Sequence, residues 1–282
     1  MRLWPRRKGR KAAGRRTFDA ARQTSLLADW LGTAGAIDAD LRGDLGRLRS
    51  RSRDLAQNND YVKRFLAMVE RNVVGPNGVN LQCRIEDAPG QPDTVANNLI
   101  EDAFDDWSRA GVCEVSGRLS FAALCRLIVR TVARDGEALI VRVEGAAARN
   151  PYGLALQLLD SARLDLNYNV DTLPGGGRIV MGVEVDGVGR PAAYHVNQAN
   201  GSRLRLSAGN VYHLFTTDSP EQTRGYPWLH TAMIRLHNLK GYDEAAIIAA
   251  RYGAQKIGMY VSPDGNPGDF ATPGKDGKPQ GT

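Results

Sequence analysis

Two acidic residues stand at an expected helix-to-strand turn, in the sequence RDGE. Asp135 and Glu137 form a D-x-E pair there, and nucleases hold divalent metal ions between carboxylates in such places. No lysine follows at a nuclease-like spacing, and Asp-Gly is also the dipeptide that a turn needs for its own backbone. We therefore favour a plain turn and keep a metal-dependent, DNA-processing site as the alternative.

The four histidines lack the surroundings of a metal site or a catalytic base. His230 and His237 share one face of an expected helix, but methionine and isoleucine occupy the places between them where a further ligand would be needed. His195 and His213 fall in expected strands, with no serine or cysteine nucleophile motif beside them. We interpret all four as surface or packing residues.

Cysteines and sequence motifs add no catalytic signal. Cys83, Cys113 and Cys125 include no C-x-x-C pair, so reduced thiols are expected rather than a zinc site. No G-x-S-x-G, P-loop or dinucleotide motif occurs, and the glycines at 175–177 precede a strand instead of a helix. Neither an enzyme, a cofactor nor a metal centre is expected.

The basic character of the chain is concentrated at its start. Residues 1–16 hold eight Lys and Arg and no acid, so the formal charge of +6 becomes about −2 for the remainder. Such a tail could neutralise DNA phosphates, or it could be a solvated or partner-docking arm. The apolar runs fall far short of the ~20 residues that span a bilayer, and no signal peptide is recognisable, so no membrane association is expected.

Three helices are expected in the first half. Helical spacing of apolar residues, ended by the GPNG turn at 75–78, predicts one helix over about 44–73, and VNLQCRI then alternates like a strand. A second helix opens with Asp93 as N-cap and a third begins near Ser120 and ends at RDG. The residues expected to face inward on the second helix are Val95, Leu99, Ala103, Phe104 and Trp107.

Strands follow, and the class predicted is α+β with helices packed on an antiparallel section. The candidate strands are 137–144, 154–160, 178–185, 191–196 and 210–215. DGVGR at 186–190 is rich in glycine and is expected to bridge two of them as a hairpin loop.

A long helix is expected from about 226, with Pro227 in its first turn. Leu229, Met233, Leu236 and Leu239 form its apolar stripe, and the small residues of AAIIAA at 245–250 would let another helix approach closely, even from another copy of the chain. Basic residues on or near this helix could face DNA or a neighbouring subunit, although a solvated face is the more ordinary account; they are Arg235, Lys240, Arg251 and Lys256. The Gly/Pro-rich residues 262–282 are expected to be a linker.

Several stretches, taken together and in order, resemble the lambda family of tailed-phage portal proteins. They are LRSRSRDLAQNNDYVKRFLAMVERNVVGPNGVNLQ, ARDGEALIVR, LQLLDSARLD, GVEVDGVGRPAAYHV and VYHLFTTDSPEQTRGYPWLHTAMIRLHNLKGYDEAAIIAA. The resemblance implies a ring of about twelve subunits at one capsid vertex, with a channel for double-stranded DNA during packaging and ejection. It also implies a virion location after synthesis in the bacterial cytoplasm. The partners it implies are the terminase large subunit, capsid and scaffold proteins, and head-completion proteins.

Mapped onto this family, the chain divides into four expected parts. Residues 1–40 would be a basic arm, 41–225 a wing-like α+β domain, 226–261 a stem-like helix with a following strand, and 262–282 a linker. Family members are longer, so we expect the second stem helix, the crown and most of the clip to be missing here.

Two further expectations concern particular side chains. Five residues would shape the start of the long helix, with Trp228 as a buried anchor; they are Gln222, Arg224, Gly225, Pro227 and Trp228. An ordinary helix start explains them equally well. The arginines of RLRSRSR, residues 47–53, first indicate a nucleic-acid-binding arm, but the charge split and the resemblance favour the polar face and subunit contacts of a wing helix.

Overall fold

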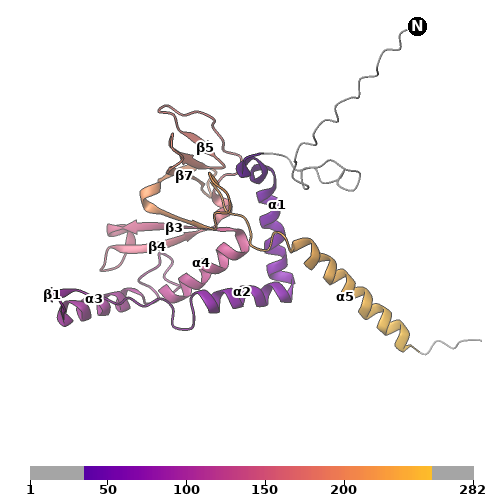
Figure 1. Ribbon diagram of the computed structural model, residues 1–282, viewed down its shortest axis with the longest axis horizontal. Helices are drawn as coiled ribbons and strands as arrows, with labels where there is room; N and C mark the ends of the chain where they lie inside the picture. Colours follow the sequence, from indigo (N-terminus) through magenta and orange to yellow (C-terminus); the bar gives the residue numbers. More distant parts are fainter. Residues whose placement is uncertain (1–34, 256–282) are drawn as a thin grey trace, which may run out of the picture.

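The computed structural model describes residues 35–255 and combines helices with antiparallel sheets, which confirms the α+β class (Figure 1). The helices are α1 (Ile37–Asn58), α2 (Asp60–Val73), α3 (Thr94–Trp107), α4 (Phe121–Asp135) and α5 (Met233–Ala254). The strands are β1 (Glu86–Ala88), β2 (Gln91–Pro92), β3 (Glu137–Glu144), β4 (Leu154–Leu159), β5 (Arg178–Val180), β6 (Val183–Val185), β7 (Pro191–Asn197), β8 (Arg203–Ser207) and β9 (Val211–Phe215). Short 3₁₀ turns lie at Gly145–Ala148, Ser161–Arg163 and Ala208–Asn210.

The single helix predicted over 44–73 is wrong, because Asn59 divides it into α1 and α2. Asn59 has extended backbone angles (φ −120°, ψ 123°), and its side chain accepts a hydrogen bond from the Val62 N–H. Asparagine offers the backbone this local alternative to a helical conformation and is a favoured N-cap. The chain turns sharply at this residue, so α2 runs in a different direction from α1 (Figure 1).

Helices α1, α2 and α4 pack together, with α2 and α4 below strands β3 and β4 and α1 beside them (Figure 1). Their shared apolar cluster includes Leu55, Val62, Leu66 and Ala133. The predicted helix beginning near Ser120 is confirmed, since the Ser120 side chain caps the first turn of α4 and Gly136 ends the helix in the left-handed conformation (φ 94°). This ending places β3 directly after α4.

The sheet region consists of a three-stranded sheet, β4-β3-β9, and a four-stranded sheet, β5-β6-β7-β8, both antiparallel. Four predicted strands are confirmed, and the hairpin at 186–190 joins β6 to β7. The fifth, 178–185, is two strands, because Met181 and Gly182 both take positive φ and reverse the chain between them. Strand β8 is not among the predicted strands. The strand predicted at VNLQCRI, residues 79–85, is wrong, because these residues do not pair with another strand within residues 35–255.

Helix α3 lies at one end of the molecule beside the β1-β2 hairpin (Figure 1). Its predicted N-cap is confirmed, since Asp93 accepts from the Ala96 N–H. Trp107 is buried, and its Nε1–H donates to the Leu154 carbonyl at 2.7 Å. The predicted inward face is wrong at Val95 and Leu99, which are 78% and 70% exposed, because only the C-terminal part of α3 meets the body.

Helix α5 begins later than predicted and projects from the body (Figure 1). Pro227 is buried in the preceding turns and is not in the first turn of α5. The reason is that the backbone before α5 is tied to α4: the Trp228 N–H donates to the Ala133 carbonyl at 3.2 Å. Met233 is the one buried residue of α5, and Leu239 of the predicted stripe is exposed.

Candidate functional site

Buried charges converge where α1, β3, β9 and the segment before α5 meet. Glu137 and Arg224 are both fully buried and face each other, with Arg224 Nε 2.9 Å from Glu137 Oε2. Arg49 Nη2 donates to the same carboxylate at 2.9 Å, and the Gly225 N–H donates to it at 3.1 Å. His213 Nε2 lies 3.0 Å from Glu137 Oε2. Four segments distant in sequence are thus joined at a single carboxylate.

A second carboxylate extends this arrangement along α1. Asp135 is fully buried and accepts hydrogen bonds from Arg53 and Arg134, and Arg53 also bridges to Asp160. Together these charged groups are called the root network below. Its members are Arg49, Arg53, Arg134, Asp135, Glu137, Asp160, His213 and Arg224.

The arginines keep the buried carboxylates ionised. Burial by itself would raise the pKa of Glu137, yet the charge of Arg224 and the hydrogen bond from His213 hold that pKa well below its ordinary value. Burial also acts to raise the pKa of Asp135, but hydrogen bonds from Arg134 and Arg53 lower it below the ordinary value. Burial lowers the pKa of Arg49, against the opposing effect of Glu137. Both carboxylates are therefore charged at neutral pH.

Two glycines allow the backbone before α5 to touch the end of α4. A Cβ built on Gly225 would lie 2.2 Å from the Gly136 carbonyl oxygen and 2.5 Å from Phe215 Cβ. A Cβ on Gly136 would meet the backbone of Tyr226 at similarly short distances. Since real Cβ atoms essentially never come so close, the contact requires glycine on both sides. The backbone contact and the root network together fix the base of α5.

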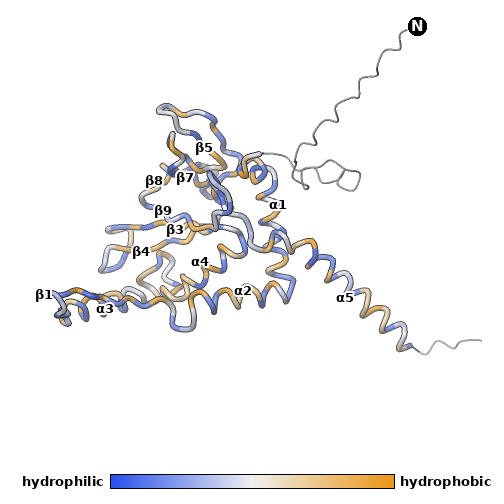
Figure 2. The backbone as a smooth tube through the Cα atoms, viewed as in Figure 1, coloured by the Kyte–Doolittle hydropathy of each residue, from blue (hydrophilic) through white to orange (hydrophobic). Residues whose placement is uncertain are grey.

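The rest of α5 stands exposed along its length of about 33 Å. Hydrophobic residues recur along it among hydrophilic ones (Figure 2). Five of them are more than half exposed: Ile234, Tyr242, Ile247, Ile248 and Tyr252. Small residues fill much of the remaining surface from Gly241 to Ala254. An exposed helix that carries apolar residues on several sides is unusual in a monomer and marks a surface for association.

Comparison with known families matches residues 23–282 to the family described as "Phage portal protein, lambda family". The chain belongs to the lambda family of phage portal proteins. Among curated proteins it is similar to a "Probable portal protein" of Halomonas phage phiHAP-1, with 36% identity over 257 residues. The match covers 87% of this chain and 49% of the relative, so this portal-family chain spans about half the length of that relative.

The structure brings four of the five residues predicted at the helix start into one buried cluster. Gln222 and Arg224 are buried, as are Gly225 and Pro227. The Gln222 side chain donates to the Arg224 carbonyl at 2.8 Å and accepts from the Asp218 N–H at 2.9 Å, so it shapes the loop before α5.

The prediction that Trp228 is a buried anchor is wrong. Trp228 is 39% exposed, and its Nε1–H reaches the Thr216 hydroxyl at 3.1 Å. The backbone of this residue makes the contact with α4, so its indole ring is left at the surface.

The basic residues predicted on α5 are not gathered into one site. Arg235, Lys240 and Arg251 are all exposed, and Lys256 lies outside the described residues. The basic tail at 1–16 also lies outside them. Whether the three exposed side chains contact DNA or a neighbouring subunit stays a prediction.

Two arginines of the RLRSRSR stretch face inward, and this corrects the prediction of a polar face. Arg49 and Arg53 belong to the root network, whereas Arg47 and Arg51 are exposed. The inward positions continue the stripe of Leu41, Leu45, Leu55 and Ala56. An arginine on an apolar stripe indicates a buried, oppositely charged partner. The prediction from sequence missed this signal because it started the helix at about 44 and traced its apolar face only from Leu55, so Arg49 and Arg53 were not recognised as lying on that face.

The helix-to-strand turn predicted at RDGE is confirmed, since Gly136 ends α4 in the left-handed conformation (φ 94°) and β3 begins at Glu137, but both carboxylates also belong to the root network. Asp135 and Glu137 are bound by guanidinium groups that repel a cation, and Gly136 between them makes the backbone contact with Tyr226. Over residues 35–255, no group of three His, Cys, Asp or Glu side chains is placed to hold a metal ion. The three cysteines carry free thiols, as predicted. None of the described helices is long and apolar enough to cross a membrane.

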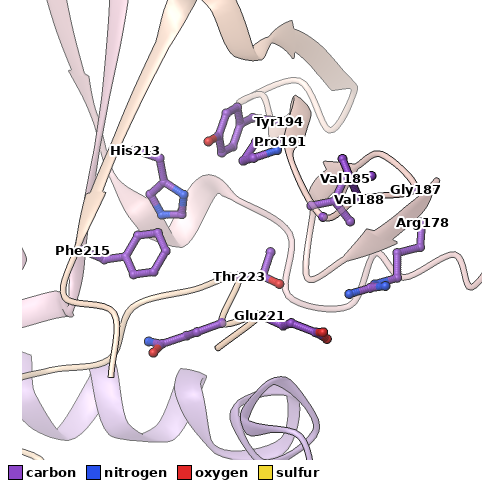
Figure 3. Close-up of a pocket in the computed structure, with 12 residues that line it drawn as sticks. Arg178, Val185, Gly187, Val188, Pro191, Tyr194, His213, Phe215, Glu221 and Thr223 are labelled. Atoms are coloured by element: carbon purple, nitrogen blue, oxygen red, sulfur yellow. The ribbon is translucent and has the colours of Figure 1, made fainter. Parts of the chain in front are cut away.

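A cavity of about 520 Å³ opens beside the root network, between the β6-β7 hairpin and the loop before α5. His213, Phe215 and Tyr194 lie on one side of it and Arg178 on the other (Figure 3). His213 already contacts Glu137, and burial raises the pKa of Tyr194 to about 12. These groups support the fold, and they are not arranged as a nucleophile with a base.

Proposed function

We propose that this chain forms the N-terminal part of a portal subunit, which assembles into a closed ring at one capsid vertex. The central channel of the ring passes double-stranded DNA inward during packaging and outward at ejection. Family membership supports this function. The observation from the structure that carries it is α5, a helix held rigidly at its base and left without partners along its remaining surface within the described residues.

The surface of α5 suits packing between copies. Small residues such as Ala245, Ala246 and Ala249 allow another helix to approach closely. Ile247 and Ile248 supply apolar area, which is worth about 25 cal/mol for each Å² buried. In a ring, each copy would bury this area against its two neighbours, since cyclic symmetry repeats one head-to-tail contact.

The partners follow from the portal role and are part of the proposal. They are the terminase large subunit, the capsid and scaffold proteins, the head-completion proteins and DNA, and the ring contains about twelve copies. The subunit is made in the host cytoplasm and resides in the virion. Its role is structural and uses no catalytic group, cofactor or metal.

We also propose the division of the chain into parts. The wing-like domain comprises α1 to β9, followed by α5 as the stem-like helix. The start of α1 at Ile37 lies close to the proposed boundary between the basic arm, residues 1–40, and the wing-like domain, residues 41–225. The linker at 262–282 lies outside the described residues.

Electron micrographs of the purified chain test the proposal. We expect closed rings of uniform diameter for the wild-type chain and their loss in Ile247→Glu/Ile248→Glu, because charged groups cannot be buried between helices without partners. Val188→Glu is the matched control, since Val188 is 88% exposed in the loop between β6 and β7, outside α5, and its change should leave the rings intact. Rings that persist in the double variant would refute the role assigned to α5.

A further inference from the structure

The exposed face of α3 is apolar at one end and acidic at the other. Val95 and Leu99 stand one turn apart and are the most exposed large apolar residues of this helix. Asp102 and Asp105 follow on the same side, at i+7 and i+10 from Val95. Neither aspartate forms an ion pair with any residue in 35–255. Residues 86–106 as a whole contain seven acids and no Lys or Arg, so this end of the molecule is strongly negative.

The exposed face of α2 also combines apolar residues with charges, but its charges are positive. Tyr61 and Met68 are more than half exposed, and Arg64 and Arg71 lie between and after them, at i+3 and i+10 from Tyr61. A shallow hollow of about 470 Å³ runs along this face, lined in part by Ala67 and Met68. Within the described part of the chain, neither of these arginines has an acidic partner. The face therefore combines apolar area with two available positive charges.

A neighbouring hollow extends this face toward α4. It shares Ala67 and Arg71 with the first and continues past Gly75 and Pro76 to Arg126. The guanidinium of Arg126 donates to the carbonyls of Gly75 and Pro76, and no carboxylate of residues 35–255 pairs with it. The two hollows together carry the arginines Arg64, Arg71 and Arg126, and the carboxylate in their lining, Glu70, is paired with Arg130.

We infer that α3 of one copy of this chain docks on the exposed face of α2 in the next copy, with Leu99 against Met68 and Asp102 paired with Arg71, each of which lies three residues further along its helix. The inference rests on the proposed ring and deepens it, because it names the surfaces that meet. The two faces are different parts of the molecule (Figure 1), so the contact is head-to-tail. Head-to-tail contacts generate rings when the rotation closes.

A second copy is the occupant that the observations favour. The exposed faces of α3 and α2 are complementary in charge, and both carry exposed apolar side chains. Every copy carries both faces. A pair of copies joined by one such contact therefore still has one free α3 face and one free α2 face, each of which can bind a further copy. Burial of the four apolar side chains supplies the attraction, and the charges fix the register.

Cysteine cross-linking tests the contact directly. A Met68→Cys chain is mixed with a Leu99→Cys chain under mild oxidation, and the disulfide-linked peptide pair is measured by mass spectrometry. We expect at least tenfold more linked product than from Val188→Cys mixed with Leu99→Cys, because Val188 is even more exposed but lies outside the proposed contact. Equal yields in the two mixtures would overturn the inference.

Charge reversal in the same assay tests the pairing of charges. Arg64→Glu/Arg71→Glu on the Met68→Cys chain should lower the yield about tenfold, and adding Asp102→Lys/Asp105→Lys to the Leu99→Cys chain should restore it. Arg118→Glu/Arg190→Glu is the control, since it makes the same charge change at two exposed arginines elsewhere. A yield that is unchanged by the first reversal, or that is not restored by the second, would overturn the inference.

The outcomes separate this contact from the ring. Rings seen in micrographs without the Met68-Leu99 link would refute the contact and leave the proposed function standing. A specific link in a chain that never closes into rings would uphold the contact and refute the ring.

Discussion

Glu137 is the residue on which the polar contacts of the body converge. It holds Arg49 of α1, Arg224 of the segment before α5 and His213 of β9. Since all four side chains are almost completely removed from solvent, each depends on the others to offset the cost of desolvation. Replacing one of these residues alone therefore lowers the free energy of unfolding by more than the whole network contributes to it, because the remaining charges stay buried without a partner.

Glu137→Gln should destabilise the chain by about 3–5 kcal/mol, because it leaves two arginines buried without a counter-charge. Urea unfolding followed by circular dichroism measures the change. Glu144→Gln is the matched control: Glu144 pairs with Arg142, and their side chains are 59% and 35% exposed, so a loss of at most about 1 kcal/mol is expected. Equal losses in the two variants would contradict the account.

The pH dependence of stability should follow from the same carboxylates. The pKa values of Glu137 and Asp135 are lower in the folded chain than their ordinary values. The stability they contribute is therefore fully present above about pH 4 and is lost as the pH falls toward the folded pKa values. Free energies of unfolding measured from neutral to acidic pH should decrease in that range, with a shallower decrease in Glu137→Gln. The same acid dependence in both chains would be the contradicting result.

Part of this network could be predicted from the sequence. The sequence predicts that Gln222, Arg224, Gly225 and Pro227 act together, and they do lie together. It could not show that Arg224 meets Glu137, because a contact across 87 positions is decided by how the strands pair and where α1 packs. RDGE resembles a local turn in the sequence because its partners are distant along the chain.

Among the elements, the segment between β9 and α5 determines where the long helix points. Its close approach to α4 depends on Gly225 and Gly136. Gly225→Ala should destabilise the chain by about 1–3 kcal/mol or more, since the new methyl group would overlap the Gly136 carbonyl and Phe215. Thermal or urea unfolding measures this loss.

The matched control is another glycine to alanine change. Gly43 lies in α1, and nothing lies within 4 Å of the position that a Cβ on this residue would take. Gly43→Ala should therefore stabilise the chain by up to about 1 kcal/mol through helix propensity. Opposite signs for the two substitutions are the expected pattern. A stabilising Gly225→Ala would show that the backbone contact is not tight.

Asn59 determines the break between α1 and α2. Asn59→Ala removes the N-cap of α2 and should cost about 1 kcal/mol. Asn58→Ala changes an exposed neighbour that bonds only Asp54 in this part of the chain, and it should cost about 0.5 kcal/mol or less. Urea unfolding distinguishes the two, and an equal cost would remove the capping explanation for the break.

Most elements could be predicted because their signals are local. The caps Asp93 and Ser120 and the alternation in 137–144 are examples in which neighbouring residues decide the conformation. The failures have tertiary causes: α5 starts late because the backbone of Trp228 bonds Ala133, and the apolar residues of α3 that are exposed have no body to pack on. The spacing of apolar residues along a helix cannot distinguish a face that packs in the core from a face that contacts another molecule.

Over the whole molecule, a rigid body carries two kinds of unpartnered surface within residues 35–255. One is α5, and the other consists of the outer faces of α2 and α3. For a lambda-family portal chain, both are explained if the functional unit is an assembly and the isolated chain is only a part of it. The body supplies rigidity through the root network, and the exposed helices supply the contacts.

The mass of the assembly in solution tests this account most directly. Native mass spectrometry of the wild-type chain should show a single closed species whose mass is a fixed multiple of 30.7 kDa and does not grow as the concentration is raised. A chain that stays monomeric up to its solubility limit, or one that forms an open ladder of sizes, would contradict the central claim that it is built to close into a ring.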